Sequence, residues 1–356
     1  MMKIDRLLEE MVKRGASDLH ISANSSPRIR VDGKLKPLDL PPLAPGEAKE
    51  LCFSLLTETQ RQKFRERNEL DISFGIKGLS RFRANIFSQR GSISAAIRTV
   101  PFKIPSFEDL GLPLILEDFV KKPKGLILVT GPSGSGKSTT VAAMIDRINS
   151  ELQGHIVTIE DPIEYLHPHK RCLVSQREVY SDTESFREAI KYVLRQDPDV
   201  VFIGEMRDQE TIETALSISE TGHLSIATLH TNNSAQTIHR ILDYFPASQQ
   251  KQVLGQLSLT LIAILSQLLL PRKDVLGRVL ALEILIPSPA IQNLIREGKI
   301  HNIYSMMLME RAKYGSQTLN QSLQKLYLDG CIDYEEAIAR SSLPDELIRL
   351  IKEGEG

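Results

Sequence analysis

The chain has 356 residues, of which 41% are hydrophobic, so it is long enough to build two domains with separate cores. Its 44 Lys and Arg nearly balance its 45 Asp and Glu, for a formal net charge of −1, which argues against a global attraction to nucleic acid or anionic membrane. Three distant cysteines (Cys52, Cys172, Cys331) without C-x-x-C spacing argue against a disulfide framework or structural zinc, and favour a cytosolic protein.

The first hundred residues predict a small α+β domain. An apolar stripe at helical spacing near the N-terminus belongs to a helix of the fold and lacks the features of a signal peptide. Asp32-Gly33 sits between two short strand patterns and predicts a hairpin of residues 28–31 and 34–38. The later elements are a helical stretch at 45–67, broken near Thr57, and a meander at 70–76, 79–87 and 92–100 with turns at 77–78 and 89–91.

Proline and glycine punctuate residues 101–113, which we interpret as an interdomain linker. From residue 114 to 356, apolar strand patterns alternate with helical ones, as is typical of a mostly parallel sheet covered on both faces. The apolar run at 253–270 has helical spacing and polar interruptions, so we expect a buried helix and no transmembrane segment. The expected strands are 126–129, 156–159, 200–203, 224–229 and 279–285, and from about 287 the chain is expected to be helical, at 289–296, 317–327 and 334–339.

Residues 131–138 (GPSGSGKS) match G-x-x-x-x-G-K-[ST], between a predicted strand and a predicted helix at 139–148. Such a loop turns its backbone N–H groups around phosphates, and the helix adds its positive N-terminal end. We expect Lys137 to contact the β/γ-phosphate oxygens and Ser138 to bind Mg²⁺. The residues expected to bind nucleotide are Ser133, Gly134, Ser135, Gly136, Lys137, Ser138 and Thr139.

Carboxylates follow two of the predicted strands. Glu205 ends the apolar run 200–203 at the place where P-loop enzymes carry the acid that organises Mg²⁺ and its waters. Glu160, Asp161 and Glu164 follow the strand 156–159 and are candidates to orient water or accept its proton. With the P-loop, these acids predict nucleotide hydrolysis.

The histidines and arginines are less specific signals. By position alone, His223 and His230 suit packing or hydrogen bonding, and the His167-Pro168-His169 run suits a surface loop better than a metal site. A P-loop motor also needs a cation against the γ-phosphate. The arginines that could supply it are Arg81, Arg83 and Arg98 in the first domain and Arg195, Arg207 and Arg240 in the second.

Four ordered blocks, at residues 131–140, 159–167, 204–208 and 221–231, together resemble the secretion ATPase superfamily, and within it the type IV pilus retraction ATPases. The resemblance extends from residue 17 to at least residue 323. It implies a PAS-like α+β domain followed by a RecA-like P-loop ATPase domain with C-terminal helices. It also implies a cytoplasmic homohexamer that hydrolyses ATP with Mg²⁺ to power pilus retraction and twitching motility.

The resemblance also implies roles for individual residues. Lys137 and Ser138 would bind phosphate and Mg²⁺, and Glu205 would be the Walker B acid that holds the metal partly through water. The other catalytic candidates are Glu160 and Glu164 as Asp-box acids, His230 as a nucleotide sensor, and Arg83 and Arg98 as phosphate contacts.

The segment 290–297 is similar to a C-terminal motif of retraction ATPases, with Gln292 in place of an arginine. The same segment also reads as an amphipathic packing helix, with Ile291, Leu294 and Ile295 turned inward. The expected partner is a pilus platform protein of the inner membrane. We expect no nucleic-acid partner, and membrane association only through other proteins.

Three alternatives remain open. A pilus extension or type II secretion ATPase would share the four blocks, but such relatives usually carry a tetracysteine zinc insertion and a longer N-terminal region. A RecA-like nucleic-acid translocase is disfavoured by the near-neutral charge and the absence of tryptophan. A regulatory paralogue of the retraction motor is disfavoured by the intact P-loop and acids.

Overall fold

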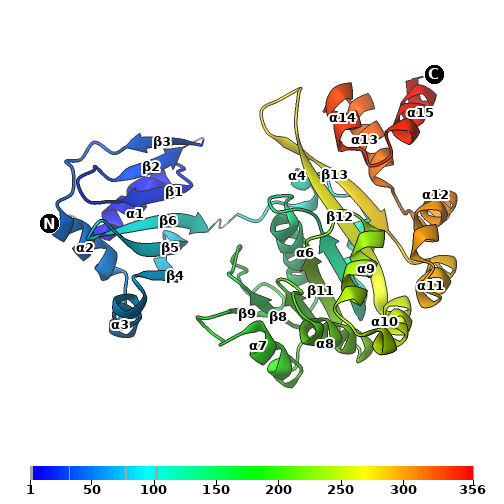
Figure 1. Cartoon of the computed structure of the whole chain (residues 1–356), viewed down its shortest axis with the longest axis horizontal. Coiled ribbons are helices and arrows are strands. Elements are labelled where there is room, and N and C mark those ends of the chain that lie inside the picture. Colours follow the sequence, from blue (N-terminus) through cyan, green and yellow to red (C-terminus); the bar gives the residue numbers. More distant parts are fainter. Residues whose placement is uncertain (1–2, 32, 77, 101–102, 356) are drawn as a thin grey trace. The chain divides into compact units, whose positions relative to one another are not determined.

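The computed structural model describes residues 3–31, 33–76, 78–100 and 103–355 (Figure 1). The chain forms two compact units, one of Met1–Lys103 with Glu164–Leu166 and the other of Ile104–Ile163 with His167–Gly356. Asp32, Lys77 and Pro101, which the sequence places in turns and in the linker, lie outside the described residues.

The first unit contains a six-stranded antiparallel sheet in the order β3-β2-β1-β6-β5-β4. The hairpin, the meander and the divided helical stretch are confirmed; β1 was missed because a four-residue strand carries too little periodicity. Thr57 causes the helical break, since its side chain caps the helix that begins at Glu58. The elements are α1 (Ile4–Lys13), β1 (Asp18–Ile21), β2 (Arg28–Val31), β3 (Lys34–Pro37), α2 (Pro45–Ser54), α3 (Glu58–Arg67), β4 (Glu69–Ile76), β5 (Ser80–Gln89) and β6 (Ser92–Val100).

The two faces of this sheet differ in character. Leu19, Ile29 and Ile97 point into a core that also contains the apolar residues of α1 and α2. Strand pairing opposes Asp18 to both Arg30 and Arg98, and Arg98 to Arg83, so these charged residues share the other face. The arginines of that face are Arg28, Arg30, Arg81, Arg83 and Arg98.

The second unit contains a seven-stranded sheet in the order β13-β12-β7-β11-β10-β8-β9, in which only the β12–β13 pair is antiparallel. The mostly parallel sheet predicted from the sequence is confirmed, and β9 and β12 are additions to it. The strands are β7 (Gly125–Thr130), β8 (His155–Glu160), β9 (Leu173–Glu178), β10 (Val200–Ile203), β11 (Leu224–Leu229), β12 (Leu261–Pro271) and β13 (Arg278–Leu285).

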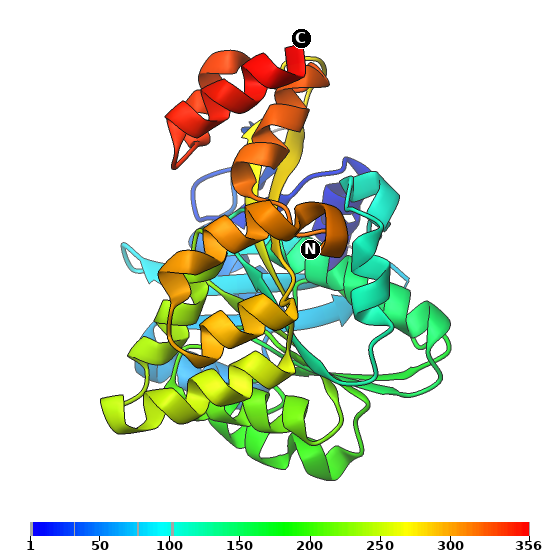
Figure 2. The same cartoon turned by 90° about the vertical axis from the view of Figure 1, so that its right-hand side faces the viewer.

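Helices cover both faces of this sheet, as alternate residues of β7 show: Leu126 and Leu128 enter one core, and Ile127 and Val129 the other. The larger core includes residues of α7 to α12, and Figure 2 shows α10 (Ala247–Thr260) and α11 (Pro289–Arg296) packed side by side on that face. The remaining helices are α4 (Phe107–Leu110), α5 (Ile115–Val120), α6 (Lys137–Glu151), α7 (Phe186–Val193), η1 (Leu194–Gln196), α8 (Gln209–Glu220), α9 (Ser234–Asp243), η2 (Ile300–Asn302), α12 (Ile303–Tyr314), α13 (Leu319–Leu328), α14 (Tyr334–Arg340) and α15 (Pro344–Glu355).

The expectation of one helix over 253–270 was wrong. Helix α10 ends at Thr260, and β12 begins at the next residue and runs between β7 and β13. A continuous apolar run has no hydrophobic periodicity that distinguishes a helix from a strand. Pairing with neighbouring strands therefore decides which of the two forms. Across the described part of the chain, no helix combines the length and apolarity needed to cross a membrane.

In the predicted linker, the described residues 103–113 contain more structure than a linker. Phe107 in α4 and Leu112 are buried in the core that α5 and α6 share with the sheet. At the other end of the chain, α13 to α15 pack on the β12–β13 hairpin through Leu270, Leu323 and Ile351 (Figure 1).

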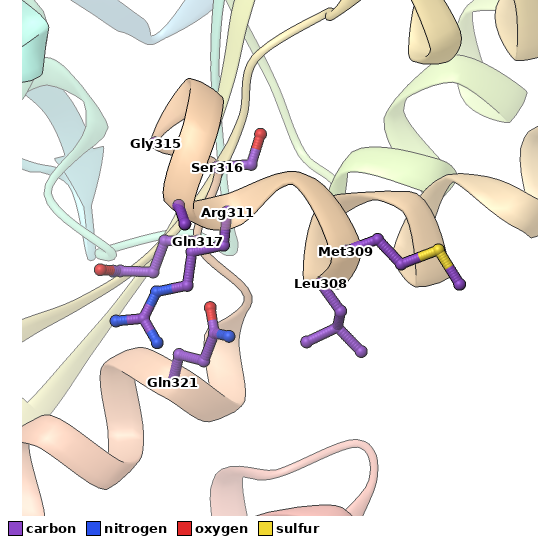
Figure 3. A pocket seen from close by; sticks show the side chains of 8 residues that line it. Leu308, Met309, Arg311, Gly315, Ser316, Gln317 and Gln321 are labelled. Atoms are coloured by element: carbon purple, nitrogen blue, oxygen red, sulfur yellow. The ribbon is translucent and has the colours of Figure 1, made fainter.

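An open pocket of about 520 Å³ lies beside α12 and the start of α13 (Figure 3). Leu308, Met309, Arg311 and Gln321 are among its lining residues, and none of the predicted site residues is.

Candidate nucleotide site

The loop from Gly131 to Gly136 joins the carboxyl end of β7 to the first turn of α6. Gly131, Gly134 and Gly136 have φ of 144°, 76° and 89°, which side chains disfavour. A Cβ on Gly131 would lie 2.4 Å from the Gln267 carbonyl oxygen. The loop is therefore a glycine-rich turn that exposes backbone N–H groups at a helix N-terminus, which is the geometry that binds phosphate.

Two hydroxyl groups, one in the loop and one in the first turn of α6, fit a phosphate and a metal ion. The buried Oγ of Ser135 has no hydrogen-bond partner in the described protein, so a ligand atom could satisfy it. Ser138 is exposed in the first turn of α6, where a hydroxyl can reach a metal ion. No group of three or more His, Cys, Asp or Glu side chains that could hold a metal by itself occurs among the described residues.

Lys137 points back across the loop. Its Nζ donates hydrogen bonds to the carbonyl oxygens of Gly131 at 2.8 Å and Pro132 at 3.0 Å, and lies 3.4 Å from Nδ1 of His230. Burial lowers the pKa of Lys137, while the nearby charge of Glu205 acts in the opposite direction. The ammonium group is thus held at the mouth of the phosphate loop.

Glu205 lies beside this lysine. It follows β10, and Oε1 lies 3.5 Å from Nε2 of His230, which follows the neighbouring strand β11. Arg207 binds the other oxygen, Oε2, at 2.7 Å through Nη2, and its Nη1 lies 3.7 Å from Oδ2 of Asp161. The structure therefore brings Lys137, Glu205 and His230 into one cluster.

The two Asp-box acids occupy different surroundings. Glu160 is buried at the end of β8 and accepts hydrogen bonds from Thr158 Oγ1 at 2.6 Å and Gln176 Nε2 at 3.1 Å. Glu164 belongs to the first unit, where it forms an ion pair of 2.9 Å with Arg83. The sequence grouped these acids, but their folded surroundings separate them.

The two histidines of the fourth block lie at opposite ends of β11, a strand inside the sheet. His223 precedes β11 beside Gly125, and its Nδ1 lies 3.2 Å from Thr221 Oγ1. The strand between His223 and His230 has six residues, so about 20 Å of extended chain separates the two. Of this pair, His230 belongs to the P-loop edge.

Arg98 on β6 is held by an acid of the neighbouring strand. Its Nε donates to Asp18 Oδ1 at 2.8 Å, while 68% of its side chain stays exposed. Burial alone would raise the pKa of Asp18, but hydrogen bonds from Ser17 and Arg98 lower it below its usual value. Arg98 is thus paired through Nε while most of its side chain is exposed.

Sequence reasoning missed the role of two residues at this edge. Arg207 was noted only as one arginine among several, although its position two residues after Glu205 could have suggested a pair. Gln176 accepts a hydrogen bond from the backbone N–H of His167 at 2.8 Å while donating to Glu160. No sequence signal linked it to Glu160, because β9 pairs with β8 only in the folded sheet.

The fold is that of a RecA-like ATPase with a second, smaller α+β domain. The family model described as "Type II/IV secretion system protein" matches residues 1–339, and the chain belongs to this family. Its architecture is a PAS-like N-terminal domain followed by a RecA-like ATPase domain, as expected from the sequence.

Three similar proteins illustrate the likeness. The chain is 46% identical to the "Type IV pilus retractation ATPase PilT" of Pseudomonas aeruginosa, over 97% of this chain and 99% of that protein. It is 42% identical to the "Type IV pilus ATPase PilU" of the same organism, over 99% and 92%. The crystal structure of "the Pilus Retraction Motor PilT and Bound ADP" matches with a TM-score of 0.92 and 52% identity, covering 98% of this chain and all of that one.

Proposed function

We propose that this chain is the subunit of an ATP-hydrolysing motor that powers retraction of type IV pili. The observation that carries the proposal is the likeness to the PilT retraction motor over nearly the full length of both chains. The described cluster of Lys137, Glu205 and His230 supports it, because these groups could bind the phosphates and the metal of a nucleoside triphosphate.

In this proposal, the backbone of 131–136 and the start of α6 bind the β- and γ-phosphates of ATP. Lys137 neutralises the γ-phosphate oxygens, and Ser138 and Glu205 would hold Mg²⁺, Glu205 partly through water. The metal, when bound, withdraws negative charge from the phosphates. Glu160 and Glu164 are the candidates to orient the attacking water or accept its proton, and His230 responds to the γ-phosphate.

Arg83 and Arg98, which belong to the N-terminal domain, are proposed to contact phosphate. Hydrolysis would then change the position of that domain. The subunits are proposed to form a homohexamer at the cytoplasmic face of the inner membrane, where a pilus platform protein receives the motion. The hexamer is proposed to reach the membrane only through other proteins and to bind no nucleic acid.

The proposal is tested by phosphate release from purified protein with Mg-ATP and by twitching motility of a retraction-deficient strain that expresses the chain. We expect hydrolysis and restored motility. The 42% identity to PilU makes an accessory ATPase the second candidate. If the protein hydrolyses ATP but restores motility only when another retraction ATPase is present, the accessory role is favoured. If it does not hydrolyse ATP, both candidates are rejected.

A further inference from the structure

Two acids follow the neighbouring strands β8 and β10, where these strands end beside each other. Asp161 follows β8 and Glu205 follows β10, on neighbouring parallel strands. The backbone of this corner is held by the hydrogen bonds of Gly204 N to Ile159 O at 2.8 Å and Met206 N to Thr228 O at 3.1 Å. Two acids at the edge that receives a polyanionic nucleotide would repel it.

The two terminal nitrogens of Arg207 contact different acids: Nη2 contacts Glu205 at 2.7 Å and Nη1 lies 3.7 Å from Asp161. A guanidinium can span two carboxylates in this way because its donors are fixed in a plane, whereas an ammonium group presents a single nitrogen. Arg207 is therefore placed to keep the two acids together.

Among the described residues, the ammonium of Lys137 and the imidazole of His230 also face Glu205. In a site that lacks Arg207, Glu205 would be drawn toward Lys137, the group that a phosphate must reach. A carboxylate paired with that lysine would compete directly with the β- and γ-phosphate oxygens of a nucleotide.

We propose that Arg207 is a positioning residue that holds Glu205 and Asp161 away from Lys137 before the metal arrives, so that the metal-free site accepts nucleotide. This inference rests on the proposed ATPase function, and deepens it by assigning one arginine to the acids within its own subunit. Arg207 acts through Glu205 and is not proposed to touch the nucleotide.

The test is binding of a fluorescent ADP analogue to the full-length protein in EDTA, so that no metal contributes. Arg207→Gln should bind about fivefold more weakly, since a partly exposed charge pair contributes up to about 1 kcal/mol. The matched control is Arg187→Gln, which removes a comparable surface ion pair with Glu210 (2.5 Å) and should leave binding unchanged.

The decisive comparison uses the Glu205→Gln background. There the carboxylate charge is absent, so adding Arg207→Gln should cause little further loss. Equal losses in both backgrounds, or no loss in either, would overturn the role assigned to Arg207.

Arg207→Lys keeps the positive charge but has a single terminal nitrogen, which cannot contact both acids as the guanidinium does, so its affinity should be intermediate. If Arg207→Gln fails to fold, the Arg207→Lys variant is used in its place. The proposed function fails separately, when the wild-type protein neither binds the ADP analogue nor releases phosphate.

Discussion

Nζ of Lys137 lies 3.4 Å from Nδ1 of His230, and Nε2 of the same imidazole lies 3.5 Å from Glu205. One histidine ring thus stands between the cation of the phosphate loop and the acid proposed to organise the metal. A phosphate that draws Lys137 away from the loop carbonyls would change the contacts of the ring, and such a change is what the proposed role of His230 as a nucleotide sensor requires.

Lys137→Ala should lower turnover by at least about 10² and weaken phosphate binding, because it removes the cation at the mouth of the loop. Phosphate release and nucleotide binding measure the two effects. Lys191→Ala, which removes a surface ion pair with Glu188 at 3.9 Å, is the control and should behave like the wild type. Wild-type activity in Lys137→Ala would reject the assigned site.

Glu205→Gln should still bind Mg-ATP but hydrolyse it slowly. The amide keeps the shape of the side chain and loses the charge that would organise metal and water. Trapping of labelled ATP together with single-turnover hydrolysis separates binding from chemistry. If trapping and turnover both match the wild type, Glu205 does not have this role.

Arg83→Ala and Arg98→Ala should each reduce turnover strongly, since an arginine at the γ-phosphate contributes on the order of 10³ in related P-loop chemistry. Arg14, an exposed arginine paired with Glu10 at 2.5 Å, supplies the control. Thermal melts show whether the variants remain folded. Full activity in both variants would remove the first domain from phosphate chemistry.

The charged end of α11 should separate motion from hydrolysis. Ile291 and Ile295 are buried on one side of the helix, whereas Arg296 and Glu297 are exposed. Replacing both charged residues by alanine should spare the fold and much of the ATPase rate, but abolish pilus retraction in cells. Phosphate release and twitching are measured on the same variant. Normal twitching would reduce α11 to a packing helix, and equal loss of both activities would indicate an assembly defect.

His167 should contribute to acid sensitivity of the fold. Burial lowers its pKa from 6.5 to about 4, so it stays neutral in the folded protein. The stability it contributes is complete above pH 6.5 and falls as the pH drops toward 4, by an amount on the order of 1 kcal/mol or more. His167→Gln should flatten this part of the curve of unfolding free energy against pH, and an unchanged slope would contradict the assignment.

The P-loop could be predicted from the sequence because its function depends on contiguous residues. Gly131, Lys137 and Ser138 act within one strand, loop and helix, and glycine is required there by φ and by close backbone approach. The polar end of β10 at Glu205 is likewise a local pattern. A site built from neighbouring residues in this way can be recognised from the sequence alone.

The tertiary structure decided which of these local signals meet. The strand order β7-β11-β10-β8 is not the chain order, and it places His230, at the end of β11, beside Lys137. The same sheet turned the second half of the apolar run 253–270 into β12, because a vacant edge beside β7 offered backbone hydrogen bonds. Contacts between residues far apart in the chain, such as Arg207 with Asp161, depend on that pairing, and no local pattern encodes it.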